Sequence, residues 1–313
     1  MMKNLQKVED LRLTKGMSIS KLIEQFGSAG GFNSKLLAEA AEILKEMYST
    51  KGCLKFLSFP ANLVSTGLRG IFRDLARRKL FDVFVTTCGA LDHDLARSFK
   101  PYYHGSFFVD DTELRARKIH RLGNVFVPEE SYGLIIEEKM QEFLREIYSR
   151  GIRELCSHEL CRELGRWMGR EDSFLYWCER NGIPVVVPGP TDGAVGYQLW
   201  LFSQDHRDFR LNPLGDEQLM NDLMWKAKST GALVVGGGIS KHHVIWWAQF
   251  RGGLDFAVYL TTAHESDGSL SGARTREAIS WGKIKKGAKH VTVEGDATIT
   301  LPLLVGALLE VAG

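Results

Sequence analysis

Short apolar runs rich in valine and isoleucine alternate with helical patterns along this sequence, and that alternation restricts the fold more than any other feature. Cys53–Phe59 (CLKFLSF) predicts a strand, LRGIFRDLARR from Leu68 predicts an amphipathic helix, and Phe81–Thr87 (FDVFVTT) predicts a second strand. A strand, a helix and a strand in this order form a βαβ unit, whose strands pair in parallel through a right-handed crossover.

The same pattern returns in the second half of the chain. Helical patterns occur at GYQLWLF, DEQLMNDLMWKAK and KHHVIWWAQF. They separate four further apolar runs that predict buried strands: Ile183–Gly189, Ala232–Gly238, Leu254–Thr262 and His290–Asp296. Strands this apolar need helices on both faces, so the sequence predicts an α/β fold with a doubly wound, mainly parallel sheet.

The two ends of the chain add helices. Asn33–Ser49 predicts a strong helix with Asn33 as its N-cap, and the run from Glu129 predicts a long helix that ends at Gly151. We therefore expect an N-terminal helical extension over residues 1–50, followed by one structural unit over residues 51–313. The apolar C-terminal run ITLPLLVGALLEVAG is shorter than the ~20 residues that span a bilayer, so it predicts a buried terminal helix. No membrane contact and a cytoplasmic location are expected.

Charge and cysteine content exclude several classes of protein. With 40 basic and 38 acidic residues, the chain lacks the basic excess that nucleic-acid binding requires, so no nucleic-acid partner is expected. Five cysteines, an odd and small number, indicate a reducing compartment. Cys156, His158 and Cys161 could be zinc ligands, but a fourth ligand at a recognisable spacing is missing, so a reduced, partly buried helix and no metal are predicted.

Polar residues gather where the predicted strands end, which is the edge at which doubly wound sheets bind ligands. Gly236–Gly238 lie between a strand and a helix, which suits a close approach to a phosphate or ribose, although a tight turn explains them equally well. They are not the dinucleotide fingerprint, because Lys241 stands where its third glycine would be. Asp-Gly pairs recur nearby, either as plain turns or as carboxylates for ribose hydroxyls and ammonium groups.

Lys283 stands out among the three lysines of SWGKIKK. A lysine becomes a nucleophile where its surroundings favour the neutral amine, and Trp281 could supply an apolar wall or a face for a cation. Glu277 lies six residues earlier and could hold an ammonium group. His242 and His243 begin a helix, so that one can line a cleft while the other is packed or solvated. From these residues alone, a surface lysine is the favoured interpretation of Lys283.

The motifs taken together resemble the deoxyhypusine synthase family. GGGISKHH, LDFAVYLTTAHESDGSLSGARTREAISWGK, ANLVSTG, VTTCGALDHDL and TDGAVG match it in order from about Cys53 to the C-terminus. The resemblance implies a Rossmann-like NAD-binding catalytic domain that uses NAD to transfer the aminobutyl group of spermidine to one lysine of the translation initiation factor 5A precursor. It also implies that an enzyme lysine carries this group as an imine, and that the family packs as a homotetramer with active sites between subunits.

The resemblance also assigns roles to residues. It makes Lys283 the covalent lysine, with His242 as a second catalytic residue, and it places Glu277 and Trp281 in the polyamine site. Asp92 and Asp267 remain as acids for the amine. The matches for NAD are Asn62, Thr87, Cys88, Gly89, Asp92, Asp192, Gly237, Gly238, Thr262, Ala263, Asp267, Ser271 and Asp296.

Three positions depart from the eukaryotic pattern. Tyr197, Leu270 and His93 stand where those relatives carry acids that bind the amine groups of spermidine. Two other functions are therefore alternatives to deoxyhypusine synthesis. One is a homospermidine synthase-like aminobutyl transferase with a small diamine acceptor, and the other is a non-catalytic NAD-binding scaffold. Retention of Lys283 and His242 argues against the scaffold.

Overall fold

The structure, a computed structural model, describes residues 5–312. The chain divides into two compact units, which are described separately: unit 1 runs to Leu57 and resumes at Met224, and unit 2 comprises Ser58–Leu223. The predicted division into residues 1–50 and 51–313 stays a prediction. Within residues 5–312, none of the helices combines the length and apolar character that crossing a membrane requires.

Unit 1 is built on parallel strands in the order β11-β10-β9-β1. Its elements in chain order are α1 (Ile19–Ala29), α2 (Phe32–Ser49), β1 (Cys53–Ser58), β9 (Ser229–Val235), α12 (Gly238–Gln249), β10 (Leu254–Thr261), the short 3-10 helix η2 (Glu265–Asp267), α13 (Thr275–Ser280), β11 (Ile284–Glu294) and α14 (Ala297–Ala312). Each strand that the sequence predicted here is present, and β9 and β11 begin earlier than predicted.

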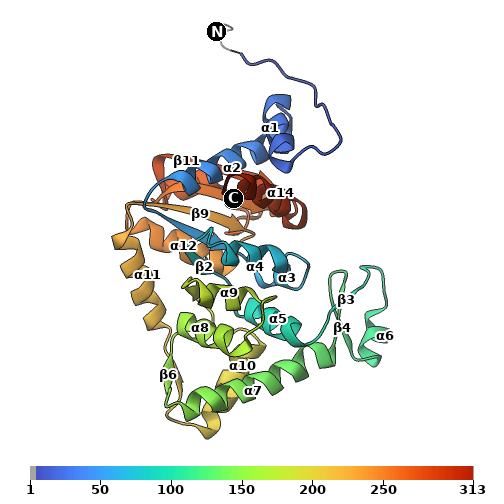
Figure 1. The fold of residues 1–313 in the computed structure, drawn as a ribbon, viewed down its shortest axis with the longest axis vertical. Helices are drawn as coiled ribbons and strands as arrows, with labels where there is room; N and C mark the ends of the chain where they lie inside the picture. The colour runs from blue at the N-terminus through green and yellow to red at the C-terminus, as the bar shows by residue number, and fades with distance from the viewer. Residues whose placement is uncertain (1–4, 313) are drawn as a thin grey trace. The chain divides into compact units, whose positions relative to one another are not determined.

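Helices cover both faces of these strands (Figure 1). Side chains alternate along a strand, so neighbouring residues point to opposite faces. On one face, a Cβ added to Gly231 would lie 2.4 Å from Met47 Sδ on α2. On the other face, Tyr259 of β10 meets Lys241 of α12. The predicted doubly wound, mainly parallel α/β fold is confirmed.

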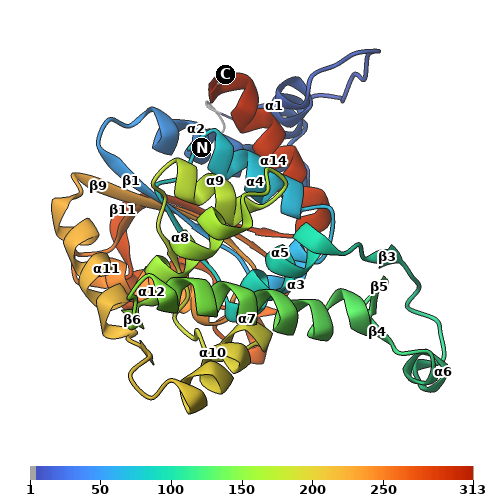
Figure 2. The same cartoon turned by 60° about the horizontal axis from the view of Figure 1, so that its bottom comes forward.

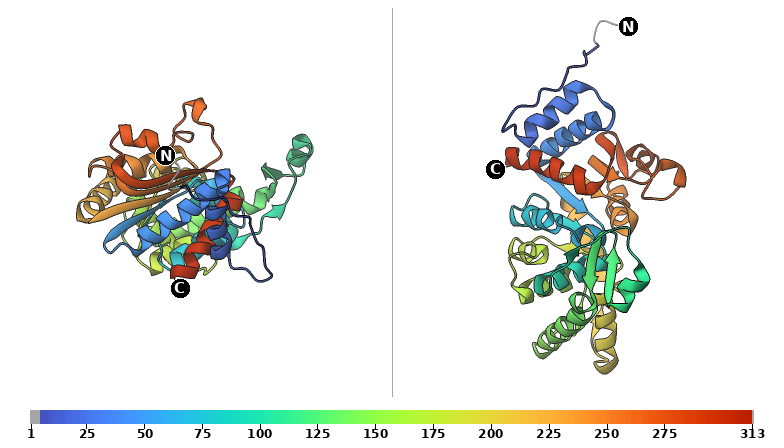
Figure 3. Two further views of the ribbon diagram at one scale, coloured as in Figure 1. Left: turned by 90° about the horizontal axis from the view of Figure 1, so that it is seen from above. Right: turned by 90° about the vertical axis from the view of Figure 1, so that its right-hand side faces the viewer.

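The chain ends of unit 1 pack together. Ser20 N on α1 donates a hydrogen bond to Glu310 Oε1 on α14, at 3.3 Å, and a Cβ added to Gly306 would meet Ile19 Cδ1. Figure 3 shows α14, in red, beside the blue α1 and α2. The predicted C-terminal helix is thus confirmed. The predicted Asn33 cap is wrong, because α2 begins at Phe32 with Gly31 as its N-cap.

Unit 2 centres on the parallel pair β2 (Val83–Val85) and β7 (Val185–Val186). Phe59, Phe72, Phe84 and Phe174 form its aromatic core, in which the rings of Phe59 and Phe72 stack at 4.0 Å. The helices around it are α3 (Ala61–Val64), α4 (Arg69–Arg77), α5 (Cys88–Phe99), α7 (Gly133–Ser149), α8 (Ser157–Met168), α9 (Phe174–Arg180) and α10 (Ala194–Asp205).

Two small sheets complete unit 2. The antiparallel strands β3 (Tyr103–His104), β5 (Val125–Pro128) and β4 (Ile119–Leu122) lie with α6 (Asp111–Ala116) near the start of α7, to which the 3-10 helix η1 (Glu129–Ser131) leads (Figure 2). A second, parallel pair joins β6 (Glu154–Leu155) to β8 (Arg210–Leu211), and α11 (Leu214–Lys226) spans the boundary between the units. None of these short strands was predicted from the sequence.

Candidate active site

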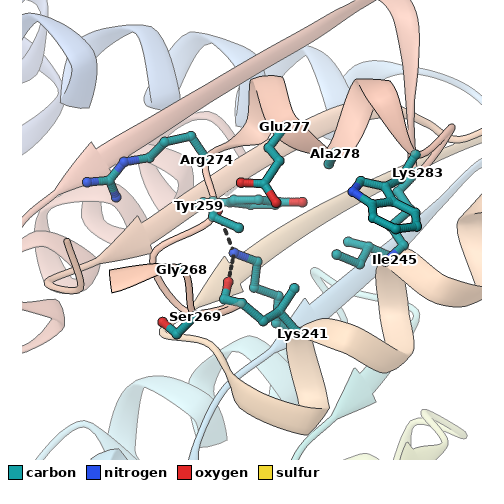
Figure 4. Close-up of a pocket in the computed structure, with 12 residues that line it drawn as sticks. Lys241, Ile245, Tyr259, Gly268, Ser269, Arg274, Glu277, Ala278 and Lys283 are labelled. Atoms are coloured by element: carbon teal, nitrogen blue, oxygen red, sulfur yellow. Dashed lines mark hydrogen bonds between the residues drawn. The ribbon is translucent and has the colours of Figure 1, made fainter. Parts of the chain in front are cut away.

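Unit 1 contains a cavity of about 220 Å³ (Figure 4). Its lining comes from the first turns of α12, from β10, from the loop before α13, from α13 itself and from the turn that follows it. The lining residues are Lys241, Ile245, Tyr259, Gly268, Ser269, Leu270, Ala273, Arg274, Glu277, Ala278, Trp281 and Lys283. Three of the predicted catalytic and substrate residues, Glu277, Trp281 and Lys283, therefore share one pocket.

Lys283 is held at the pocket by its backbone. Its N–H donates to Ala278 O at 2.9 Å, and its carbonyl accepts from Leu254 N at 3.0 Å. Gly282, with a φ of +67°, makes the turn that a residue with a side chain would resist. The ammonium nitrogen lies 5.4 Å from the centroid of the Trp281 ring, within range of a cation–π contact. The side chain is half-buried, so the predicted nucleophile faces both the indole and the pocket.

Glu277 is the single acid among the lining residues. It lies in the first turn of α13 and is exposed at the pocket, where its charge favours the ammonium form of Lys241. Trp281 ends that helix and is 66% exposed. A carboxylate and a free indole face can together hold one substrate ammonium group and its methylene chain.

Lys241 is a pocket residue that reasoning from the sequence missed. Its side chain is buried, and its Nζ donates to Leu270 O at 2.6 Å and to Ala273 O at 2.8 Å. The nitrogen lies 4.4 Å from the centroid of the Tyr259 ring. A sequence signal existed, since Lys241 immediately precedes the two histidines, but burial of a lysine cannot be seen in a single sequence.

The two histidines of α12 have different surroundings. His243 is buried, whereas His242 is exposed and its ring stacks on Trp246 with the centroids 5.7 Å apart. Partial burial, with a smaller effect from the charge of Lys283, lowers the pKa of His242. His242 is not part of the cavity lining, so its predicted role in catalysis stays a prediction.

The residues of unit 1 that are predicted to bind NAD gather at one edge of the sheet. Because β9, β10 and β11 run in parallel, their ends lie side by side, with Gly236 N bonded to Leu260 O and Gly295 N to Thr261 O. Thr261 Oγ1 also donates to Ser271 O at 3.0 Å. The predicted residues at or next to this edge are Gly237, Gly238, Thr262, Ala263, Asp267, Ser271 and Asp296.

This edge has features that suit a dinucleotide. The first turn of α12 has no side-chain cap, so its N–H groups can meet phosphate oxygens. Gly238 has a φ of +71° and open space where a Cβ would be, which leaves room for a ligand against the helix. Asp296 lies just before α14 and its exposed carboxylate accepts from Thr298 N at 2.8 Å. Asp267 is likewise exposed, and its hydrogen bonds from Ser269 lower its pKa.

The remaining predicted NAD residues lie in unit 2. Their positions are at the starts of α3 and α5 and in the turn before α10: Asn62, Thr87, Cys88, Gly89, Asp92 and Asp192. Cys88 is buried, and this burial raises the pKa of its thiol to about 12. Asn62 and Asp192 are exposed and available to a ligand.

Asp92 is 0% exposed, and its carboxylate is already engaged. It accepts hydrogen bonds from Ala194 N at 2.9 Å, from Val195 N at 2.8 Å and from Tyr132 OH at 2.7 Å. Asp92 therefore caps the N-terminus of α10 from the neighbouring helix α5. Its predicted contacts with the amine and with NAD stay predictions.

The departures from the eukaryotic pattern have different surroundings. Leu270 lines the pocket and adds an apolar side chain there. Tyr197 is exposed on α10. His93 is half-buried on α5, with Nδ1 3.0 Å from Tyr102 OH, and burial, aided by the charge of Arg97, lowers its pKa to about 4. A neutral imidazole thus stands where eukaryotic relatives carry an acid.

Within the described chain, a single group of side chains has the spacing of metal ligands: Cys156, His158 and Glu159. Glu159 Oε2 accepts from Cys156 N at 3.0 Å, and His158 Nδ1 lies 2.8 Å from Asp216 Oδ1. These bonds close the N-terminus of α8, as a helix cap does. Cys161 lies one turn further on, so the predicted partly buried helix is confirmed, and the expected reduced state without a metal stays a prediction.

The lysine, the carboxylate and the indole around this pocket give it the chemistry of an enzyme site that can bind an amine and form a covalent bond to its substrate. The model of the family described as "Deoxyhypusine synthase" matches residues 21–308. The chain belongs to the deoxyhypusine synthase family.

Individual relatives agree with this assignment. The "Probable deoxyhypusine synthase" of Thermoplasma acidophilum is 51% identical over 302 residues, which cover 96% of this chain and 97% of the relative. Its namesake from Picrophilus torridus is 52% identical over 303 residues, 97% of each chain. A solved structure from Entamoeba histolytica, named as a candidate deoxyhypusine synthase, has the same fold, with a TM-score of 0.68, 21% identity and 96% of each chain covered. The family match and the two relatives from Thermoplasma and Picrophilus support deoxyhypusine synthase function.

Proposed function

We propose that this chain makes deoxyhypusine by transferring the aminobutyl group of spermidine, through Lys283, to one lysine of the translation initiation factor 5A precursor. The observation that carries this proposal is the pocket in which Lys283 lies with Glu277 and Trp281. NAD, when bound, would take a hydride from spermidine, which turns an inert carbon–nitrogen bond into an exchangeable C=N bond. The same hydride would be returned at the end to the C=N bond formed with the factor's lysine, and this reduction gives the secondary amine of deoxyhypusine.

The residues of the chain have separate tasks in this proposal. Glu277 pairs with a substrate ammonium group, and Trp281 covers the methylene chain and excludes water from it. The amine of Lys283 attacks the C=N carbon, releases 1,3-diaminopropane and holds the butyl group as an imine until the lysine of the factor replaces it. His242, which is exposed on α12, would exchange protons as the acceptor lysine enters.

The cofactor residues are proposed from their positions. The uncapped start of α12 and Gly238 would hold phosphate oxygens, and Asp296 would hold ribose hydroxyls. The homotetramer and the cytoplasmic location implied by the resemblance remain proposals as well. Native mass spectrometry would measure the subunit count directly.

The test follows label from spermidine carrying radioactivity in its butyl group, incubated with NAD, with and without the factor 5A precursor. We expect label on the factor. Lys283→Ala should remove it completely while leaving the melting temperature within a few degrees, because the amine makes the covalent bond. Lys286→Ala, three residues away and exposed, is the matched control and should retain wild-type transfer. Normal transfer by Lys283→Ala would contradict the covalent role.

One observation favours a second acceptor. Leu270 lines the pocket at a position where eukaryotic relatives carry an acid, so Glu277 is the single acid available there. One carboxylate can pair with one ammonium group of a ligand. A small diamine acceptor has one ammonium group left once its other nitrogen has reacted, so it would suit this pocket. Label that appears in small polyamines upon addition of putrescine, and never on the factor, would support this homospermidine-forming activity instead.

A further inference from the structure

Lys241 lies in the pocket, yet it has no role in the function proposed above. The side chain is 1% exposed, and the two carbonyl oxygens that it reaches, those of Leu270 and Ala273, belong to the loop that forms one wall. Figure 4 shows these bonds, with the carboxylate of Glu277 on the same side of the pocket. A buried lysine that faces a reaction pocket calls for a chemical explanation, because burial of a charged lysine is costly.

The hydrogen bonds of Lys241 are compatible with either protonation state. A neutral amine has two N–H groups, enough for Leu270 O and Ala273 O, and its lone pair is then left over. An ammonium group has three donors, so the third is left over instead. Lys241 can therefore gain or lose a proton without losing either bond to the loop, and the side chain keeps its position during the exchange.

The groups around Lys241 bring the two states close in free energy. Burial is the largest influence and favours the neutral amine, as do the nearby charges of Arg274 and Lys283, whereas Glu277 favours the ammonium form. Together they lower the pKa of Lys241 to about 8. The face of the Tyr259 ring, 4.4 Å away, gives the ammonium form a weak additional contact. Both forms of Lys241 are accordingly populated in mildly alkaline solution.

The transfer step needs such a group. When the amine of Lys283 adds to the C=N carbon of the oxidised substrate, that carbon carries two nitrogens. The Lys283 nitrogen must lose a proton and the leaving nitrogen must gain one before the old carbon–nitrogen bond can break. The proton is conserved between the two nitrogens, and no redox change accompanies its transfer.

We propose that Lys241 carries this proton, its neutral amine taking it from the Lys283 nitrogen and its ammonium returning it to the nitrogen of the departing 1,3-diaminopropane. The inference rests on the covalent role of Lys283 in the proposed function. In this proposal the loop from Gly268 to Arg274 lines the pocket and also holds Lys241 in position, through hydrogen bonds to its carbonyl oxygens.

The test measures how fast the butyl adduct on Lys283 forms in a single turnover with NAD and spermidine, without the factor. Borohydride traps the imine, and peptide mass spectrometry counts it. In the wild-type enzyme we expect the rate to depend on one ionisation near pH 8. Lys241→Met should form the adduct about 100-fold more slowly, and that ionisation should disappear, because general acid–base groups typically contribute this much.

Lys241→Arg separates proton transfer from a structural role. Arginine keeps the charge and the donors to the loop but does not release its proton, so it should be as slow as Lys241→Met. A wild-type rate in Lys241→Arg would overturn the inference, as would an ionisation near pH 8 that persists in either variant. A wild-type profile without this ionisation would overturn it as well, even if both variants failed to fold.

The same experiment distinguishes a failure of the proposed function from a failure of the inference about Lys241. If the wild-type enzyme forms no adduct on Lys283, the covalent step of the proposed function fails and the inference falls with it. If the adduct forms normally in the wild type and in both Lys241 variants, the proposed function stands and the inference alone is wrong.

Discussion

Asp92 and Asp94 lie two residues apart on α5, and both carboxylates are fully buried. Asp92 caps α10, whereas Asp94 accepts hydrogen bonds from Arg69 Nε at 2.7 Å and from Ser173 Oγ at 2.6 Å. The resemblance to the family implies a ligand-binding role for Asp92 and none for Asp94. Their structural partners lie 25 to 103 residues away, so a single sequence cannot reveal them.

The first prediction concerns His93, between these two acids. Its pKa is about 4 in the folded chain and about 6.5 in an unfolded one, so only the unfolded chain binds the proton between those values. Its contribution to stability is therefore complete above pH 6.5 and is lost as the pH falls toward 4. Chemical denaturation across this range should show a smaller loss of unfolding free energy in His93→Gln than in the wild type.

Exposed His104 provides the control for this effect. His104→Gln should keep the wild-type pH dependence, because this substitution leaves the buried imidazole of His93 in place. An equal slope in His93→Gln and the wild type would show that the buried imidazole is not the group responsible.

At the level of elements, local pattern predicted the long helices and the apolar strands well. It missed the antiparallel sheet of β3, β5 and β4, whose strands have only 2, 4 and 4 residues and are too short to show a periodic pattern. It also could not show how closely helices approach. Helices α8 and α9 meet at Gly165, where an added Cβ would lie 2.4 Å from Leu175 O.

The second prediction follows from this crossing. Gly165→Ala should destabilise unit 2 by about 1–3 kcal/mol, because the obstacle is backbone, and the helices must separate to admit the methyl group. The midpoint of urea denaturation, with the m-value fixed, would measure this. Gly133→Ala, at the start of α7 with open space around its Cβ, should be neutral or slightly stabilising. Equal midpoints for the two variants would contradict the close contact.

At the scale of the whole molecule, the chain composes unit 1 from its two ends and unit 2 from its middle. The N-terminal helices belong with α14 and the strands of the second half, as the bond from Ser20 to Glu310 illustrates. The predicted boundary after residue 50 rests on local pattern alone and stays a prediction. Packing between segments that are distant in sequence decides which residues form a unit.

A third prediction tests the cofactor on the whole molecule. NAD at about 100 times its dissociation constant should stabilise the folded protein by about 2.7 kcal/mol, which raises the melting temperature by several degrees. Asp296→Ser should reduce this increase, because serine retains the cap on α14 but is too short to hold a ribose. The melting temperature without NAD should be nearly that of the wild type. An unchanged NAD effect would remove Asp296 from the cofactor site.

The sequence by itself determined the α/β class, the positions of the main strands and helices, and the motif that contains Lys283, Trp281 and Glu277. It could do so because hydrophobic periodicity and short motifs are local properties of a chain. The tertiary structure alone decided that Lys241 is buried beside these residues and that Asp92 caps a distant helix. Those facts depend on burial and on hydrogen bonds between distant segments, and such contacts exist only once the chain has folded.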